Sequence, residues 1–169
     1  MLPQLYFFVS IAFSFIAWGM VAKRYVWPRL RVLGRAEALR PILMLHSFRF
    51  IGLAFLVPGV VSPDLPSAFA HFDAYGDIIA ATLALLALLS LPGVAGVVLA
   101  WIFNIWGAAD LLDAFYQGNH AALMPGQLGA TYFIPTVIVP LLLITHGLAF
   151  RILLQRQNAP AVLERRQPA

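Results

Sequence analysis

Residues 23–61 read KRYVWPRLRVLGRAEALRPILMLHSFRFIGLAFLVPGVV, a basic segment followed by an apolar one. Ten of the eleven basic residues of the chain lie in two segments, Lys23 to Arg40 and Arg151 to Arg166, and all five aspartates lie between them. Short loops that carry Lys and Arg stay on the cytoplasmic side of a membrane. This separation of charges therefore predicts a multi-pass membrane protein with a fixed orientation.

The composition excludes a water-soluble fold. Hydrophobic residues make up 62% of the 169 residues, charged residues make up 11%, and the mean hydropathy is +0.86, whereas a soluble domain has about 25% charged residues. The net charge of +4 fits an orientation signal and attraction to anionic lipid at the cytoplasmic face, so we expect no nucleic-acid partner. The chain has no cysteine, which excludes disulfides and thiolate metal sites, and no metal site is expected.

The apolar runs predict an all-α integral membrane protein, a five-helix transmembrane bundle with its N-terminus outside and its C-terminus in the cytoplasm. Because its basic flank follows the first run, we interpret this run as a retained helix and not as a cleaved signal peptide. This orientation places every basic segment in the cytoplasm. The predicted location is a bacterial-type cytoplasmic (inner) membrane. The predicted spans are about 4–22, 41–61, 74–90, 94–116 and 129–150, within a single bundle of residues 1–158 that precedes a disordered basic cytoplasmic tail, 159–169.

Prolines mark the expected ends of these spans. Trp27-Pro28 is expected to break the first helix, and Pro41 is expected to lie in the first turn of the second. Leu91-Pro92-Gly93 interrupts an apolar stretch that is too long for one span. Since Pro and Gly together favour a tight turn, this tripeptide predicts a helical hairpin.

Arg49 is the remaining basic residue, and it lies inside an apolar run. An Arg in the apolar layer costs roughly 2.5 to 3.5 kcal/mol on insertion scales, so it requires an acidic or polar partner. We predict an ion pair within the bundle, with Asp77 as the first candidate and Asp110 as the second, because these are the nearest acids by depth.

Other polar residues are expected at a series of depths through the bundle, above and below Arg49. With a helical rise of about 1.5 Å per residue, His46 and His146 each lie about 8 Å from the cytoplasmic boundary, and Asn104 lies about 16 Å from it. On the fifth span, Tyr132 and His146 belong to one stripe of alternating three- and four-residue steps. The predicted ligand-binding residues are Arg49, Asp77, Asn104, Asp110, His46, His146 and Tyr132.

Several classes of function remain once the motifs of soluble hydrolases are found absent. The working hypothesis is an intramembrane cavity that binds or translocates a small polar or amphipathic ligand, or protons, since ionisable groups inside a membrane usually mark such paths. A b-type haem protein with His46 and His146 as axial ligands is an alternative, and haem is then the expected cofactor. Further alternatives are a membrane-embedded enzyme acting on a lipid or isoprenoid, with His46 or Asp77 as acid or base, and an accessory subunit of a larger membrane complex. The expected protein partners are further copies of the chain, in a homo-oligomer, or the other subunits of such a complex.

Overall fold

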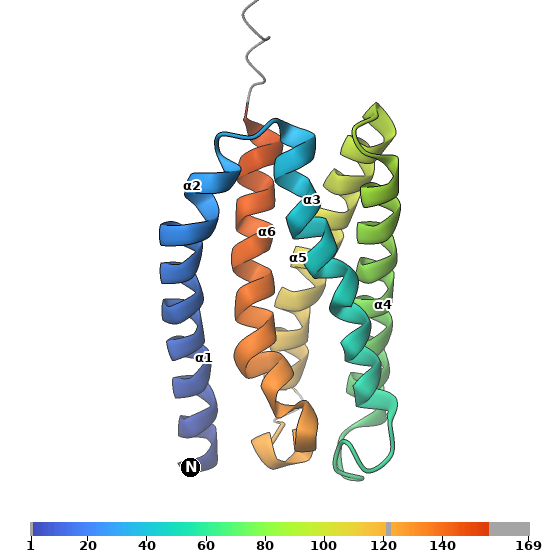
Figure 1. The fold of residues 1–169 in the computed structure, drawn as a ribbon. Helices are drawn as coiled ribbons and strands as arrows, with labels where there is room; N and C mark the ends of the chain where they lie inside the picture. Colours follow the sequence, from blue (N-terminus) through green and yellow to red (C-terminus); the bar gives the residue numbers. More distant parts are fainter. Residues whose placement is uncertain (1, 121–122, 156–169) are drawn as a thin grey trace, which may run out of the picture.

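Every regular element in the described part of the chain is a helix. The structure is a computed structural model that describes residues 2–120 and 123–155, so the expected disordered tail, 159–169, lies outside the described residues. The α-helices are α1 (Leu2–Val21), α2 (Trp27–Leu30), α3 (Arg35–His46), α4 (Ser67–Ser90), α5 (Val94–His120) and α6 (Val139–Leu154) (Figure 1). The 3-10 helices are η2 (Ser47–Leu56) and η3 (Pro125–Tyr132), and the π-helices are η1 (Ala22–Val26) and η4 (Ile134–Ile138).

These elements join into five continuous helices that are long and apolar enough to cross a membrane, which indicates a multi-pass membrane protein. The five helices are Leu2–Leu30, Arg35–Leu56, Ser67–Ser90, Val94–His120 and Ile134–Leu154. The expected all-helical bundle with five apolar helices is confirmed in this respect, and the turn at residues 91–93 lies where the sequence predicts it.

Two expectations about proline were wrong. Trp27-Pro28 does not break the first helix, because the helix widens into the π-helix η1 just before it and continues to Leu30. Pro41 does not begin the second helix, which starts at Arg35 and carries this proline in its interior. A proline ring clashes with the carbonyl four residues earlier, and a π turn ahead of Pro28 moves that carbonyl away. The π-helix η4 lies in the same position relative to Pro140.

The second helix changes its period halfway along. Buried positions in α3 follow the spacing of an α-helix, whereas the buried residues of η2 are Arg49, Gly52 and Phe55, each three positions after the last. A 3-10 helix has about three residues per turn, so these three residues form one straight line along its buried face. His46, the last residue of α3, stands at the head of this line.

Small residues bring α4 close to its neighbours. The buried positions of α4 include Asp77 and are otherwise only alanine and glycine. Small side chains allow helix backbones to approach closely where no hydrophobic force favours one apolar surface over another. Consequently α4 packs closely against both η2 and α5.

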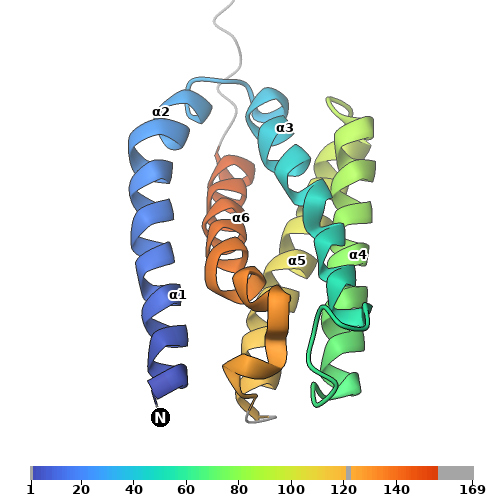
Figure 2. The same cartoon turned by 60° about the horizontal axis from the view of Figure 1, so that its bottom comes forward.

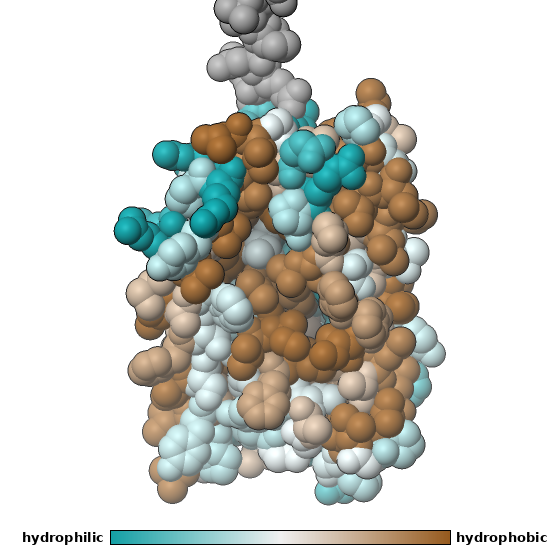
Figure 3. All heavy atoms as spheres, viewed as in Figure 1, coloured by the Kyte–Doolittle hydropathy of each residue, from teal (hydrophilic) through white to brown (hydrophobic). Residues whose placement is uncertain are grey.

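The first helix lies at the edge of the bundle (Figures 1 and 2). None of the residues of α1 is buried, and this helix is held to the fifth by contacts such as the hydrogen bond from Trp18 Nε1 to the Val137 carbonyl, at 3.1 Å. At one end, α2, the start of α3 and the end of α6 meet, and Arg35 Nη2 donates to the Gln155 carbonyl at 2.7 Å. We call this the basic end; hydrophilic residues gather there over α2 and the start of α3 (Figure 3).

The opposite end, which we call the N-terminal end, carries Leu2, the loop 57–66 and η3. The loop and η3 are joined by hydrogen bonds from Ala130 N to the Val60 carbonyl, at 2.8 Å, and from Ser62 N to the Gln127 carbonyl, at 3.0 Å. Gly129 has a φ of 53°, and a Cβ at this position would overlap the Val60 carbonyl. These contacts hold the loop 57–66 and η3 together at this end of the bundle.

Candidate functional site

Arg49 lies at the centre of the bundle with 1% of its surface exposed. Its Nε donates to Asp77 Oδ1 at 2.7 Å, its Nη2 is 2.6 Å from the same oxygen and donates to Asp110 Oδ2 at 2.5 Å, and its Nη1 donates to the Gly107 carbonyl at 3.2 Å. The predicted ion pair with Asp77 is confirmed, and Asp110 binds the guanidinium at the same time. We call Arg49, Asp77 and Asp110 the charge triad.

Three glycines on three helices make room for the triad. A Cβ on Gly52 would overlap the Asp77 carboxylate, and a Cβ on Gly76 would overlap the carboxylate of Asp110. A Cβ on Gly107 would lie 2.8 Å from Arg49 Nη1 and 2.7 Å from a ring carbon of His146. Each charged side chain thus lies directly against the backbone of a neighbouring helix, and the triad is packed without spare volume.

On the side of Gly107 that faces α6, Asn104 holds His146. Asn104 Nδ2 donates to the His146 carbonyl at 3.3 Å, and its Oδ1 is 2.7 Å from His146 Nδ1. Since this amide oxygen can only accept, Nδ1 carries the ring proton and donates it. The Nε2 lone pair of His146 is then buried without a hydrogen-bond partner among the described residues.

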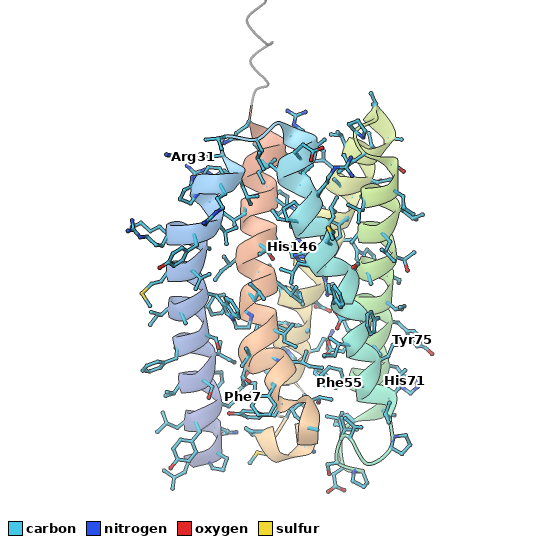
Figure 4. The ribbon with its side chains drawn as sticks, viewed as in Figure 1. Phe7, Arg31, Phe55, His71, Tyr75 and His146 are labelled. Atoms are coloured by element: carbon cyan, nitrogen blue, oxygen red, sulfur yellow. The ribbon has the colours of Figure 1, made fainter. Side chains whose placement is uncertain are left out.

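His46 repeats this arrangement beside it. Its Nε2 is 2.9 Å from Thr145 Oγ1, and the single hydroxyl proton of Thr145 is directed to the carbonyls of Leu141 and Leu142. His46 Nδ1, on the other side of the ring, is buried without a hydrogen-bond partner in the described part of the chain. Both rings pack against Phe103, and their centroids are 4.2 Å apart. Figure 4 shows His146 in the interior of the bundle.

The two histidines meet, as their matching depths predict, but their spacing does not fit haem. A metal–imidazole bond is about 2 Å long, so two axial nitrogens are about 4 Å apart and the ring centroids are farther apart still. With centroids at 4.2 Å and an angle of 55° between the rings, no porphyrin plane fits between His46 and His146. This geometry does not support the haem alternative.

Next to the triad, at the N-terminal end, lies a cavity of about 460 Å³. Its wall is mostly apolar and aromatic, with side chains from α1, η2, α4, α5 and the segment 123–139. Figure 4 labels two of its residues, Phe7 on α1 and Phe55 on η2. Among the described residues Asp73 is the one acidic residue in the wall, and it is half-buried one helical turn before Asp77 on the same face of α4. We call this space the aromatic cavity.

The sequence-predicted residues fall into three groups. Arg49, Asp77 and Asp110 form the triad, and His46, His146 and Asn104 form a polar layer beside it. None of these six side chains lines the aromatic cavity. Tyr132 lies apart from both groups, with its hydroxyl 3.4 Å from Ser10 Oγ on α1.

Two features of the site were missed in the sequence. Asp73 fell outside the predicted spans because the third span was expected to begin at about residue 74, whereas α4 begins at Ser67. The three-residue spacing of Arg49, Gly52 and Phe55 was the signal for a 3-10 face, and it predicts that Gly52 lies beside the triad.

Comparison with known proteins identifies a family. A family model described as "Domain of unknown function (DUF8737)" matches residues 6–154, and the chain belongs to this family. No curated protein and no solved structure matches the chain. The triad, the polar layer and Asp73 all lie within the matched region.

Proposed function

We propose that the protein binds a small amphipathic molecule within the membrane, in the aromatic cavity, with the polar end of the molecule toward Asp73. In this proposal the chain lies in a bacterial-type cytoplasmic membrane with its basic end in the cytoplasm, where Lys and Arg contact anionic lipid. The N-terminal end, with the cavity, then lies on the outer side.

The observation that carries the proposal is the cavity itself. Its volume of about 460 Å³ is within the range of about 300–1,000 Å³ that is typical of small-molecule sites. Such sites are mainly hydrophobic and aromatic, with a few polar groups that fix the orientation of the ligand. Here the aromatic side chains are Phe7, Phe8, Phe55, Phe69 and Phe115, and the polar groups are Gln4, Asp73 and Asn119.

The position of the cavity favours a ligand that partitions into lipid. One wall is formed by Gln4, Phe7 and Phe8 of α1, the helix without buried residues at the edge of the bundle. An amphipathic molecule in the bilayer therefore has only this helix between it and the cavity. A purely polar molecule would lose its hydration against the phenylalanine rings, and the few polar groups in the wall would replace only part of its hydrogen bonds to water.

Filling the cavity tests the proposal. Ala114 lies in the cavity wall on α5, and Ala109 is an exposed alanine on the same helix outside that wall. Neopentylbenzene, a neutral aromatic probe, should raise the melting temperature of the purified wild-type protein, because a ligand that binds the folded state stabilises it. Ala114→Trp should abolish this rise, and Ala109→Trp should retain it. A rise that is equal in the two variants, or absent from wild type, contradicts binding in the cavity.

A further inference from the structure

Acidic groups outnumber basic groups around the aromatic cavity. Between residues 41 and 150, Arg49 is the only Lys or Arg in the sequence. Asp77 and Asp110 both bind its guanidinium, so the triad contains one acidic group more than its single basic group can neutralise. Asp73 adds another carboxylate, and the charged groups that face it are Asp77, Asp110 and Arg49.

The carboxyl group of Asp73 lacks the hydrogen bonds that stabilise the carboxylates of Asp77 and Asp110. Among the described residues, no side chain donates a hydrogen bond to its carboxylate, whereas Asp77 and Asp110 accept from Arg49. A charge in the apolar layer of a membrane is costly unless an opposite charge accompanies it. The carboxylate in the cavity wall therefore favours an occupant that brings positive charge.

The rest of the wall suits the same occupant. The face of an aromatic ring carries partial negative charge and attracts a cation within about 6 Å, most strongly where water is excluded. Five phenylalanines line the cavity, and none of the described residues in its wall is basic. Inorganic cations prefer oxygen ligands, and Asp73 is the one carboxylate here, so a cation with an apolar body fits this wall better.

We propose that the occupant of the aromatic cavity is a small organic cation with an apolar body, a quaternary or protonated amine, whose charge lies against Asp73. This inference rests on the proposed function and specifies the class of ligand. When the cation is absent, a proton bound to the Asp73 carboxyl group offsets the same charge. Cation and proton then compete: the bound cation and the carboxylate replace the free cation and the carboxyl group, and one proton is released to the solvent.

The test compares two probes of nearly equal shape. Benzyltrimethylammonium carries a positive nitrogen where neopentylbenzene carries a neutral carbon, and tetramethylammonium has the charge without the aromatic body. We expect wild type to bind benzyltrimethylammonium about tenfold more tightly than either other probe. Its affinity should fall as the pH is lowered, because protons occupy the carboxylate, while the affinity for neopentylbenzene should not change.

Asp73→Asn is the matching variant, since it removes the charge and keeps the shape. It should bind both aromatic probes equally and lose the dependence on pH. Asp113→Asn is the control. Asp113 is another half-buried acid, in the half of the bundle nearer the N-terminal end, but it does not line the cavity, so this variant should behave as wild type. Melting temperatures over a series of probe concentrations give the affinities.

The outcomes separate this inference from the function on which it rests. If neither aromatic probe binds, the aromatic cavity is not a ligand site and the proposed function itself fails. If both bind equally to wild type, the cavity takes neutral molecules and the assignment of a cation is wrong. If the preference for the cation persists in Asp73→Asn, the charge that attracts it is not that of Asp73.

Discussion

At the scale of the residue, the Arg49 side chain determines how the centre of the bundle is held. All three of its nitrogens donate to acceptors on two helices, α4 and α5. A buried ion pair is often no more stabilising than an apolar pair of the same shape, but the loss of one partner leaves the other charge buried and unpaired. In this triad, loss of Arg49 would strand two carboxylates against each other.

Arg49→Leu should therefore lower the free energy of unfolding by about 3 to 5 kcal/mol. Adding Asp77→Asn or Asp110→Asn should each restore part of this loss, because each removes one stranded charge. The triple variant should restore most of it. Unfolding of the purified proteins in detergent, followed by circular dichroism, measures the effect. A triple variant that is no more stable than Arg49→Leu would show that the charges are not coupled.

The Arg40–Glu37 pair provides the control for this series. Its two charged atoms are 3.0 Å apart, and both side chains are exposed at the basic end. An exposed pair contributes about 1 kcal/mol or less. Arg40→Leu should thus have a small effect, and a loss as large as that of Arg49→Leu would mean that burial does not explain the result.

The sequence predicted the triad but not the acid beside it. The cost of an unpaired Arg in an apolar run is enough to require a carboxylate at similar depth, which pointed to Asp77 and Asp110. Asp73 could not be found in this way, because its contribution depends on where α4 begins. Tyr132 was placed with the site by assuming one α-helical period from residue 129, whereas the chain passes through η3 and η4, and the change of period rotates it away.

At the scale of the element, the 3-10 helix η2 places the triad. Runs of 3-10 helix longer than three or four residues are uncommon, and η2 has 10. With about three residues per turn, Gly52 lies one turn after Arg49 on the same line, directly beneath the carboxylate that Arg49 binds. An α-helix here would rotate Gly52 away and turn a larger side chain toward Asp77.

Gly52→Ala should destabilise the protein by more than about 2 kcal/mol, because the added methyl group must displace the Asp77 carboxylate from Arg49. Gly147→Ala is the matched control, since a Cβ on Gly147 meets nothing within 4 Å. In a helix this second change should stabilise the protein by up to about 1 kcal/mol. Chemical unfolding of both variants in detergent compares them. Equal stability of the two variants would disprove the close packing at Gly52.

Apolar run length predicted which segments are helical, but it could not predict their type. The five helices and the turn at residues 91–93 follow from runs and breakers alone. The starts at Arg35 and Ser67 were missed, because charged residues interrupt the first half of each helix. They include Glu37 and Arg40 in α3, and Asp73 in α4. Nor does hydropathy report the 3-10 and π turns, which depend on proline sterics and on the neighbouring helices.

At the scale of the whole molecule, the surface is apolar around the bundle and basic at one end. Large hydrophobic side chains on α1, such as Phe8, Phe13 and Ile16, are exposed, as expected of a helix that faces lipid. Apart from Arg49, the Lys and Arg residues in the described part of the chain gather at the end where α2, α3 and α6 meet, and Figure 3 shows hydrophilic residues there. Positive charge at one end is the pattern that orients a multi-pass protein with that end in the cytoplasm.

Reporter fusions test this orientation. A reporter fused after Gln127, at the N-terminal end, should be active only outside the cytoplasm, and one fused after Arg156 should be active only inside it. The two positions flank the fifth helix, so they should report opposite sides of the membrane. If both fusions report the same side, the fifth helix does not cross the membrane. If the two sides are reversed, the proposed orientation is wrong.

The close fit between glycines and charges also constrains how this family can evolve. Any residue larger than glycine at position 52 collides with the aspartate at 77, and the same holds for positions 76 and 110. A lineage that changes one member of such a pair loses stability until the other changes as well. Substitutions at 52 and 77, and at 76 and 110, should therefore covary among descendant sequences, because each pair of positions is in contact in the fold.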